Sequence, residues 1–112
     1  MQDMNLLNFF SEVNTKDVLQ YLPDAVFVVD ESNAEILWAN DRAAVIFETP
    51  KEELKGVNFN DVVVKGMELA EQSSYKDVAV IGGAVVNSKE FFVELSANLL
   101  DTQYFITVRD VT

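Results

Sequence analysis

Apolar and polar residues alternate in a way that predicts a β-hairpin in the first third of the chain. Two β-rich runs, residues 25–29 and 35–39, flank a polar turn at residues 30–34. The first run is apolar on both of its faces, which is typical of a strand that is covered on both sides. The rest of the domain is therefore expected to pack around this hairpin.

The segment before the hairpin has a helical pattern. Apolar side chains between residues 4 and 13 recur at helical spacing, which predicts an amphipathic helix that needs a surface to lie on. Thr15 can cap a second short helix that Pro23 interrupts. We therefore expect an N-terminal cap helix in residues 1–14 and one domain in residues 15–112.

Capping residues predict three helices after the hairpin. Asn40 can cap a helix over residues 41–48. The segment Thr49-Pro50-Lys51-Glu52 has the form of a capping box with proline at the first helical position, and Gly56 can close that helix. Asn60 can cap a third helix over residues 61–72, although three consecutive valines and an interior glycine lower its helix propensity.

The remainder of the chain reads as three strands, over residues 77–86, 90–100 and 103–111, with turns at residues 87–89 and 101–102. Gly82 and Gly83 predict a bulge or bend in the first of them, and the apolar flanks of this pair are expected to be largely buried. The order of elements predicts an α+β fold with helices packed on one antiparallel sheet.

Composition excludes several kinds of chemistry. The chain has 112 residues, enough for one core, and a formal net charge of −11, which disfavours nucleic acid and anionic membranes as partners. It has no Cys and no His, so thiolate nucleophiles, imidazole bases and the commonest zinc and haem ligands are missing. No apolar run approaches the ~20 residues of a membrane span, and the first residues lack a secretory signal. We expect a cytoplasmic domain that is not itself an enzyme.

Short motifs in a fixed order resemble those of PAS domains over about residues 15–112. They are Leu22-Pro23-Asp24, Asp30, Trp38-Ala39-Asn40, Glu52-Glu53-Leu54-Lys55-Gly56 and the terminal Arg109-Asp110-Val111-Thr112. The resemblance implies a five-stranded antiparallel sheet whose first two strands are central, with helices over one face and an internal cavity for a signal molecule. It also implies that Asp110, Val111 and Thr112 pass the signal to the C-terminal effector domain of a parent protein, such as a histidine kinase, a cyclic-dinucleotide enzyme or a transcription regulator.

The resemblance also limits the cofactors. In the light-sensing flavin branch an Asn-Cys pair follows the glycine, whereas Asn58 and Phe59 stand at the matching positions here. A Gln near the end of the last strand contacts the flavin in that branch, and Arg109 aligns with it. Haem-binding members typically use an axial His. His-ligated haem and Cys-adduct flavin are therefore excluded, and the cofactor is otherwise unknown.

Alternate residues of a strand share one face of the sheet, and the resemblance indicates which face lies under the helices. Together they assign a mostly apolar set of residues to the possible cavity. These residues are Phe27, Val29, Ile46, Phe47, Leu54, Phe59, Val62, Val93, Leu95, Ala97, Phe105, Thr107 and Arg109. The set fits either a cavity for a small apolar or flat ligand or an ordinary filled core. Arg109 either meets a ligand carboxylate, reaches solvent or pairs with a protein carboxylate such as Glu48 or Asp30.

The other face of the sheet is the expected interface, because an exposed apolar patch of its size is atypical of a monomer. Its residues are Val26, Val28, Phe92, Tyr104, Ile106 and Val108, and its expected cover is the N-terminal helix with Leu6, Phe9 and Phe10. The helix either folds back on its own sheet or exchanges across a homodimer. The sequence thus predicts a PAS sensor and dimerisation module; the alternative is a ligand-free protein–protein interaction domain that uses this face.

Overall fold

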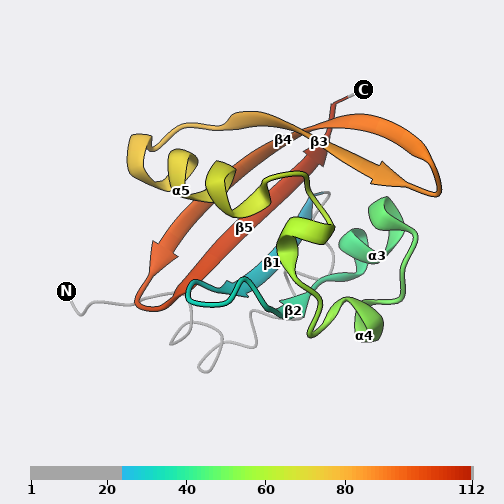
Figure 1. The fold of residues 1–112 in the computed structure, drawn as a ribbon, viewed down its shortest axis with the longest axis horizontal. Helices are drawn as coiled ribbons and strands as arrows, with labels where there is room; N and C mark the ends of the chain where they lie inside the picture. The colour runs from blue at the N-terminus through green and yellow to red at the C-terminus, as the bar shows by residue number, and fades with distance from the viewer. Residues whose placement is uncertain (1–23, 112) are drawn as a thin grey trace.

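The computed structural model describes residues 24–111, which form an α+β domain (Figure 1). The strands are β1 (Ala25–Asp30), β2 (Ile36–Ala39), β3 (Val80–Val86), β4 (Lys89–Leu100) and β5 (Gln103–Asp110). The helical elements are α3 (Asp41–Phe47), α4 (Lys51–Leu54), the 3-10 turn η1 (Phe59–Asp61) and α5 (Gly66–Lys76). The two helices predicted before the hairpin lie outside the described residues.

The five strands form one antiparallel sheet in the order β2-β1-β5-β4-β3. The apolar strand β1 is internal, as predicted, but the expectation that the first two strands are both central is wrong, because β2 lies at one edge and β5 lies in the middle. Residues 56–59 run along the edge of β2. The N–H of Ile36 donates to the carbonyl of Val57 at 2.9 Å, and the N–H of Gly56 donates to the carbonyl of Ile36 at 2.7 Å. These bonds satisfy backbone groups that an open edge would leave unpaired.

The predicted bulge at Gly82 and Gly83 is wrong, since β3 pairs with β4 without a shift along its whole length. The irregularity lies in the opening hairpin, where the register of β1 and β2 shifts between Val28 and Val29. As a result, two residues of β2, Leu37 and Trp38, both pack beside Val28. A bulge of this kind re-aims side chains on one strand.

Gly82 instead permits close packing between β3 and α5. A Cβ at this position would lie 2.5 Å from Cδ1 of Leu69 in α5. The apolar flanks of the glycine pair are not largely buried as expected, because Ile81 is 59% exposed and Val85 is 52% exposed. The reason is that β3 is the edge strand of the sheet, with one side chain in two facing away from the helices.

α3 begins as predicted, because Oδ1 of Asn40 accepts from the N–H of Ala43 at 3.0 Å. The predicted capping box before α4 is wrong. Oγ1 of Thr49 donates to the carbonyl of Phe47 at 3.0 Å, and Pro50 occupies the N-cap position without a side-chain bond. The Thr49 hydroxyl therefore satisfies the end of α3 rather than the start of α4.

The helix predicted over residues 61–72 begins later, at Gly66, and extends to Lys76. The β-branched residues 62–64 lie before it, which agrees with their low helix propensity. Asn60 still contributes a cap, but from a distance: its Oδ1 accepts from the N–H of Met67 at 2.9 Å. The intervening Lys65 has a left-handed backbone with φ of 54°.

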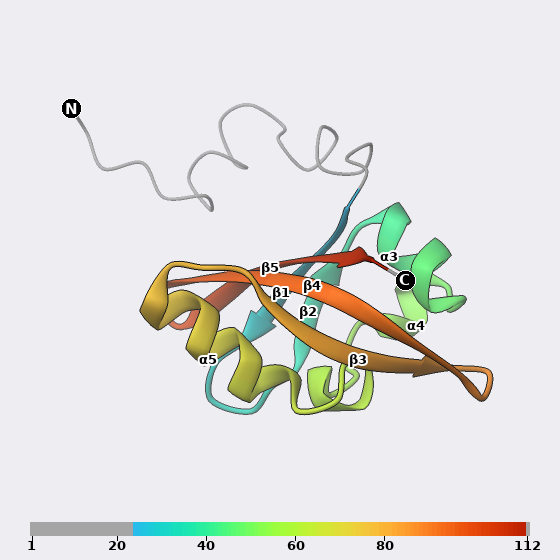
Figure 2. The same ribbon diagram turned by 90° about the horizontal axis from the view of Figure 1, so that it is seen from above.

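The core lies between the helices and the sheet face that carries Phe27, which we call the inner face. Figure 2 shows α5 lying along one side of the sheet. Ser73 of α5, 1% exposed, fixes this contact, because its Oγ donates to the carbonyl of Val78 at 2.6 Å and accepts from the N–H of Ala97 at 2.9 Å. No local sequence pattern indicates this role for Ser73.

Candidate functional site

The centre of the inner face is filled by aromatic rings from β1, α3 and η1. Phe27 meets Phe47 edge-on with ring centroids 5.7 Å apart, and it meets Phe59 edge-on at 5.3 Å. All three rings are at most 5% exposed. Edge-to-face contacts of this kind stabilise a core beyond the area they bury. At this point of the inner face, the predicted cavity residues form a packed cluster.

A small hollow remains beside that cluster, where the ends of α3 and β3 approach each other. It has a volume of about 200 Å³ and is lined in part by Phe47, Leu54 and Val62, three of the predicted cavity residues. Its rim is polar. Nδ2 of Asn87, in the β3–β4 turn, donates to Oε1 of Glu48 at 2.6 Å across the rim. We call this space the α3 hollow.

The other residues that were predicted to face the cavity fall into two groups. Val29, Val93, Leu95 and Ala97 belong to the inner core, and Ile46 packs against it, as expected. Phe105, Thr107 and Arg109 do not, because the residues of β5 that face inward are the ones that were predicted to face outward. Phe27 pairs with Ile106 and Val28 pairs with Phe105, and residues opposite each other in neighbouring strands share a face.

The same correction applies to the predicted interface. Tyr104, Ile106 and Val108 lie in the inner core, with exposed fractions of 6%, 0% and 0%. The physical reason is that β5 is apolar or aromatic at nearly every position from residue 104 to 108. Its hydrophobic pattern therefore does not indicate which alternate side chains face the core. Only the pairing with β1 and β4 decides which side chains turn inward.

The outer face carries Val26, Val28 and Phe92 as predicted, together with Phe105. Val28 and Phe105 form a second apolar cluster against which Leu37, Trp38 and Leu100 pack. Phe92 is 63% exposed, whereas Val28 and Phe105 are at most 7% exposed. Of the remaining predicted interface and output residues, Leu6, Phe9, Phe10 and Thr112 lie outside the described residues.

An apolar groove with a volume of about 400 Å³ runs along β3 and the start of β4. Val64, whose N–H donates to the carbonyl of Gly83 at 2.9 Å, lies at one side of it, and Val85, Phe91 and Phe92 contribute apolar surface. Within residues 24–111 this groove is larger than the α3 hollow. Sequence reasoning did not anticipate it, because the groove depends on β3 being an edge strand.

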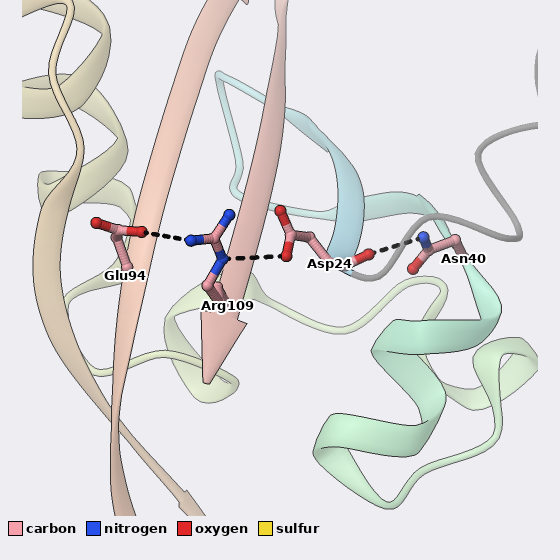
Figure 3. A network of polar contacts seen from close by, with 4 residues as sticks. All are labelled: Asp24, Asn40, Glu94 and Arg109. Carbon is pink, nitrogen blue, oxygen red and sulfur yellow. Dashed lines mark hydrogen bonds and ion pairs between the residues drawn. The ribbon is translucent and has the colours of Figure 1, made fainter. Parts of the chain in front are cut away.

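Arg109 is part of a polar network at the end of β5 (Figure 3). Its Nε lies 3.3 Å from Oδ1 of Asp24, and its Nη1 lies 3.6 Å from Oε1 of Glu94 on β4. The carbonyl of Asp24 in turn accepts from Nδ2 of Asn40 at 3.1 Å. Arg109 thus pairs with protein carboxylates, but with Asp24 and Glu94 rather than with Glu48 or Asp30, and its side chain is 61% exposed.

The end of β5 is tied to β4 by the backbone as well. The N–H of Val111, just after the strand, donates to the carbonyl of Phe92 at 3.1 Å. Asp110 is the last residue of β5 and pairs with Val93. Two of the three predicted output residues, Asp110 and Val111, therefore leave the sheet beside the backbone of residues 92 and 93 in β4.

Within the described part of the chain, no three Asp or Glu side chains come together in a way that can hold a metal ion. No helix between residues 24 and 111 is both long and apolar enough to cross a membrane. The chain has no His or Cys to ligate haem or to form a flavin adduct.

Comparison with known proteins agrees with this geometry. Residues 14–93 match the family described as the PAS fold, and the chain belongs to the PAS family. PAS domains are sensory domains. No curated protein sequence matches the chain.

Solved structures of low sequence identity share the fold. A PAS domain from a two-component sensor histidine kinase is 19% identical, with a TM-score of 0.72 over 96% of this chain and 99% of that one. The PAS domain of a LuxR-family transcriptional regulator from Burkholderia thailandensis, solved in complex with ethanol, is 17% identical, with a TM-score of 0.72 over 86% and 96%. A light-oxygen-voltage domain studied with a flavin analogue is 14% identical, with a TM-score of 0.69 over 90% and 87%.

Proposed function

We propose that this PAS domain is a cytoplasmic, non-catalytic sensor and dimerisation module of a signal-transduction protein. In this proposal, a small ligand or a partner shifts the population of two arrangements of the domain, and β5 passes the shift to a C-terminal effector. Similarity in fold to a histidine-kinase PAS domain and to a transcription-regulator PAS domain supports a role in signalling.

The observation that carries the proposal is a continuous chain of contacts from the α3 hollow to the end of β5. Phe47 of α3 lines the hollow, and Asn40 caps the same helix. Asn40 bonds the carbonyl of Asp24, and Arg109 near the end of β5 bonds the Asp24 carboxylate (Figure 3). A ligand that displaces α3 would therefore change the surroundings of the output strand.

The ligand that fits the α3 hollow is small and carries polar groups, because Glu48, Thr49, Asp61 and Asn87 line the hollow together with apolar residues. A volume of about 200 Å³ lies below the usual range of drug-sized pockets, which begins near ~300 Å³. The ethanol complex of the Burkholderia domain is an example of a small molecule bound to this fold. The Asn87–Glu48 bond lies at the rim, where a ligand could exchange hydrogen bonds with either side chain.

A double-mutant cycle tests the relay. We expect Asn40→Ala and Arg109→Ala to be non-additive in the free energy of unfolding by about 0.5 kcal/mol or more, because both side chains act on Asp24. Asn40→Ala combined with Lys89→Ala, at the start of β4, is the matched control and should be additive. If the free energies of unfolding are additive for both pairs, the proposed connection between α3 and β5 is contradicted.

Native mass spectrometry of the purified domain tests sensing. A compound that co-purifies with the domain and is lost in Val62→Phe, which fills the α3 hollow, supports a ligand there. Val45→Phe, at a position on α3 that is 62% exposed, is the control for the added ring and should retain the compound. A domain that is free of any compound from several expression hosts would contradict the sensing of a small ligand and would favour the interaction module.

For dimerisation, the proposed contact is the exposed end of the outer face around Phe92, because Val26, Val28 and Phe105 are already buried within one copy. The exposed ring of Phe92, next to the end of β5, is the test position. We expect Phe92→Glu to lower the solution mass from dimer to monomer, while Val45→Glu leaves it unchanged. A wild-type domain that is monomeric at high micromolar concentration would contradict the dimer.

The alternative function is a ligand-free interaction domain that binds another protein through the outer face. One observation favours it: the groove along β3, at about 400 Å³, is twice the size of the α3 hollow, and its lining includes the exposed apolar residues Val64, Val85 and Phe92. Loss of partner binding in Phe92→Glu, together with an absent small-molecule ligand, would select this function over sensing.

A further inference from the structure

The hairpin of β3 and β4 projects past the end of β5 (Figure 2). β5 pairs with β4 from Val93 to Leu100, and residues 89–92 of β4 have β3 as their neighbour among the described strands. We call residues 84–91, which form this two-stranded projection, the β3–β4 arm. A hairpin of two strands is marginally stable by itself, so the position of the arm depends on what it touches.

The arm touches the end of α3. The ring centroids of Phe91 and Phe47 lie 6.1 Å apart, and Nδ2 of Asn87 donates to Oε1 of Glu48 at 2.6 Å. Phe91 is only partly buried, and the hydrogen bond is exposed, so water can replace that bond at a small cost in free energy. The contact between the arm and α3 can therefore open without unfolding of the core.

The same arm forms one wall of the α3 hollow. Val85, Val86 and Asn87 line the hollow from the arm, and the ends of α3, α4 and η1 line it from the other side. The tip of the arm is a two-residue turn with left-handed backbone at Asn87, φ 51°, and at Ser88, φ 67°. Turns of this type fit the twist of the strands that they join, so the arm moves as one piece. Any movement of the arm changes the width of the hollow.

Gly83 lies at the base of the arm and pairs with Phe92, the last residue of β4 before its pairing with β5 begins. Neither packing nor backbone conformation requires a glycine here, because a Cβ would meet nothing within 4 Å and the φ of Gly83 is not in the left-handed region. Glycine weakens a strand through its conformational freedom. The carbonyl of Gly83 is held by the N–H of Val64 at 2.9 Å, which gives this residue a fixed pivot. Gly83 therefore has the properties of a hinge.

The base of the arm also contacts the output end of β5, because the N–H of Val111 donates to the carbonyl of Phe92 at 3.1 Å. We propose that the β3–β4 arm is the moving element of the domain, turning about Gly83 and held against α3 by the Asn87–Glu48 bond. Its position passes the state of the α3 hollow to Val111, one of the predicted output residues. This inference rests on the proposed sensing function for its ligand, whereas the movement itself can be measured without a ligand.

Native-state hydrogen exchange of the whole chain, followed by NMR without added ligand, measures the opening of the arm. The reporter is the amide of Phe91, which pairs with Ala84 in the arm, and the reference is the amide of Ile106, which pairs with Phe27 in the middle of the sheet. We expect Phe91 to exchange faster than Ile106 by about tenfold or more, after correction for intrinsic exchange rates. Equal protection of the two amides would show that the arm opens only when the domain unfolds, and would overturn the proposal.

The bond to α3 is tested by Glu48→Gly, which removes the carboxylate and suits the left-handed backbone of this position, φ 52°. Asp101→Gly is the matched control, because it removes the same charge at another left-handed position, φ 62°, in the turn after β4. Glu48→Gly should speed exchange at Phe91 by about threefold or more and shift the amide resonance of Val111, whereas Asp101→Gly should do neither. Equal effects of the two variants would overturn the proposal.

The hinge is tested by Gly83→Ala, which should slow exchange at Phe91 by about twofold or more, because alanine has less backbone freedom in the open arm. Unchanged or faster exchange would contradict Gly83 as the hinge. If the arm opens as expected but no compound co-purifies from any expression host, the movement stands and the sensing of a small ligand fails. If a compound binds while Phe91 is as protected as Ile106, the sensing stands and the moving arm fails.

Discussion

Asn40 and Val26 bond to each other twice. The N–H of Asn40 donates to the carbonyl of Val26 at 3.1 Å, and the N–H of Val26 donates to Oδ1 of Asn40 at 3.0 Å. The same Oδ1 accepts from the N–H of Ala43, so one buried amide joins the first strand to the start of α3. A residue whose local pattern predicts a helix cap thus also closes the base of the opening hairpin.

Asn40→Ala is expected to destabilise the domain by about 2–3 kcal/mol, because it removes a helix cap and leaves a buried backbone N–H without its acceptor. Urea unfolding followed by circular dichroism measures this change. Asn33→Ala is the control, since Oδ1 of Asn33 accepts from the N–H of Glu35 in the exposed hairpin turn. If Asn40→Ala lowers the free energy of unfolding no more than Asn33→Ala does, the two hydrogen bonds between Asn40 and Val26 stabilise the domain no more than an exposed turn bond does.

Gly66→Ala is expected to destabilise the domain by about 1–3 kcal/mol, although alanine favours helices. A Cβ at Gly66 would lie 2.6 Å from Cδ2 of Phe59, a ring that is fully buried against Phe27. Gly83→Ala is the matched control, because a Cβ there meets nothing within 4 Å. It should be neutral or stabilise the domain by about 0.5 kcal/mol. The free energy of unfolding of the two variants in urea distinguishes these outcomes.

The sequence predicts best the elements that have strong local signals. Asn40 starts α3, Asp30 accepts from the N–H of Ser32 at 2.8 Å in the hairpin turn, and residues 87–88 form a tight turn with left-handed backbone at both positions. Each signal acts over three or four residues. The order of elements, and hence the family, follows from such local patterns.

The sequence predicts poorly what depends on neighbours in space. The phase of β5, the edge position of β3 and the role of Ser73 between α5 and β4 are set by strand pairing and packing. The candidate sites show the same division. Phe47 and Leu54, which were predicted to line a cavity, line the α3 hollow, whereas the groove along β3 brings together residues that are distant in sequence.

Asp30 gives a prediction about acid stability. Hydrogen bonds from the Ser32 hydroxyl at 2.6 Å and from the Ser32 N–H lower the pKa of Asp30 below its usual value of 3.8. Since the folded-state pKa is the lower one, these bonds stabilise the fold above about pH 3.8, and their contribution is lost as the pH falls through the folded pKa. In an NMR titration of the carboxyl carbons, Ser32→Ala should raise the pKa of Asp30. An unchanged pKa would mean that the hydroxyl bond does not form in solution.

The phase of β5 has a direct test in two neighbouring residues. Ile106 is fully buried on the inner face between Phe27 and Ala97, whereas Thr107 turns to the outer face opposite Val26. Ile106→Ala should therefore cost about 2–5 kcal/mol, and Thr107→Ala should cost about 1 kcal/mol or less. Urea unfolding of both variants decides between this arrangement and the one projected from the inner face of the family, in which Thr107 faces the helices. If Thr107→Ala proved the more damaging change, the assignment of Arg109 to the outer rim would fail with it, because both follow from the same strand pairing.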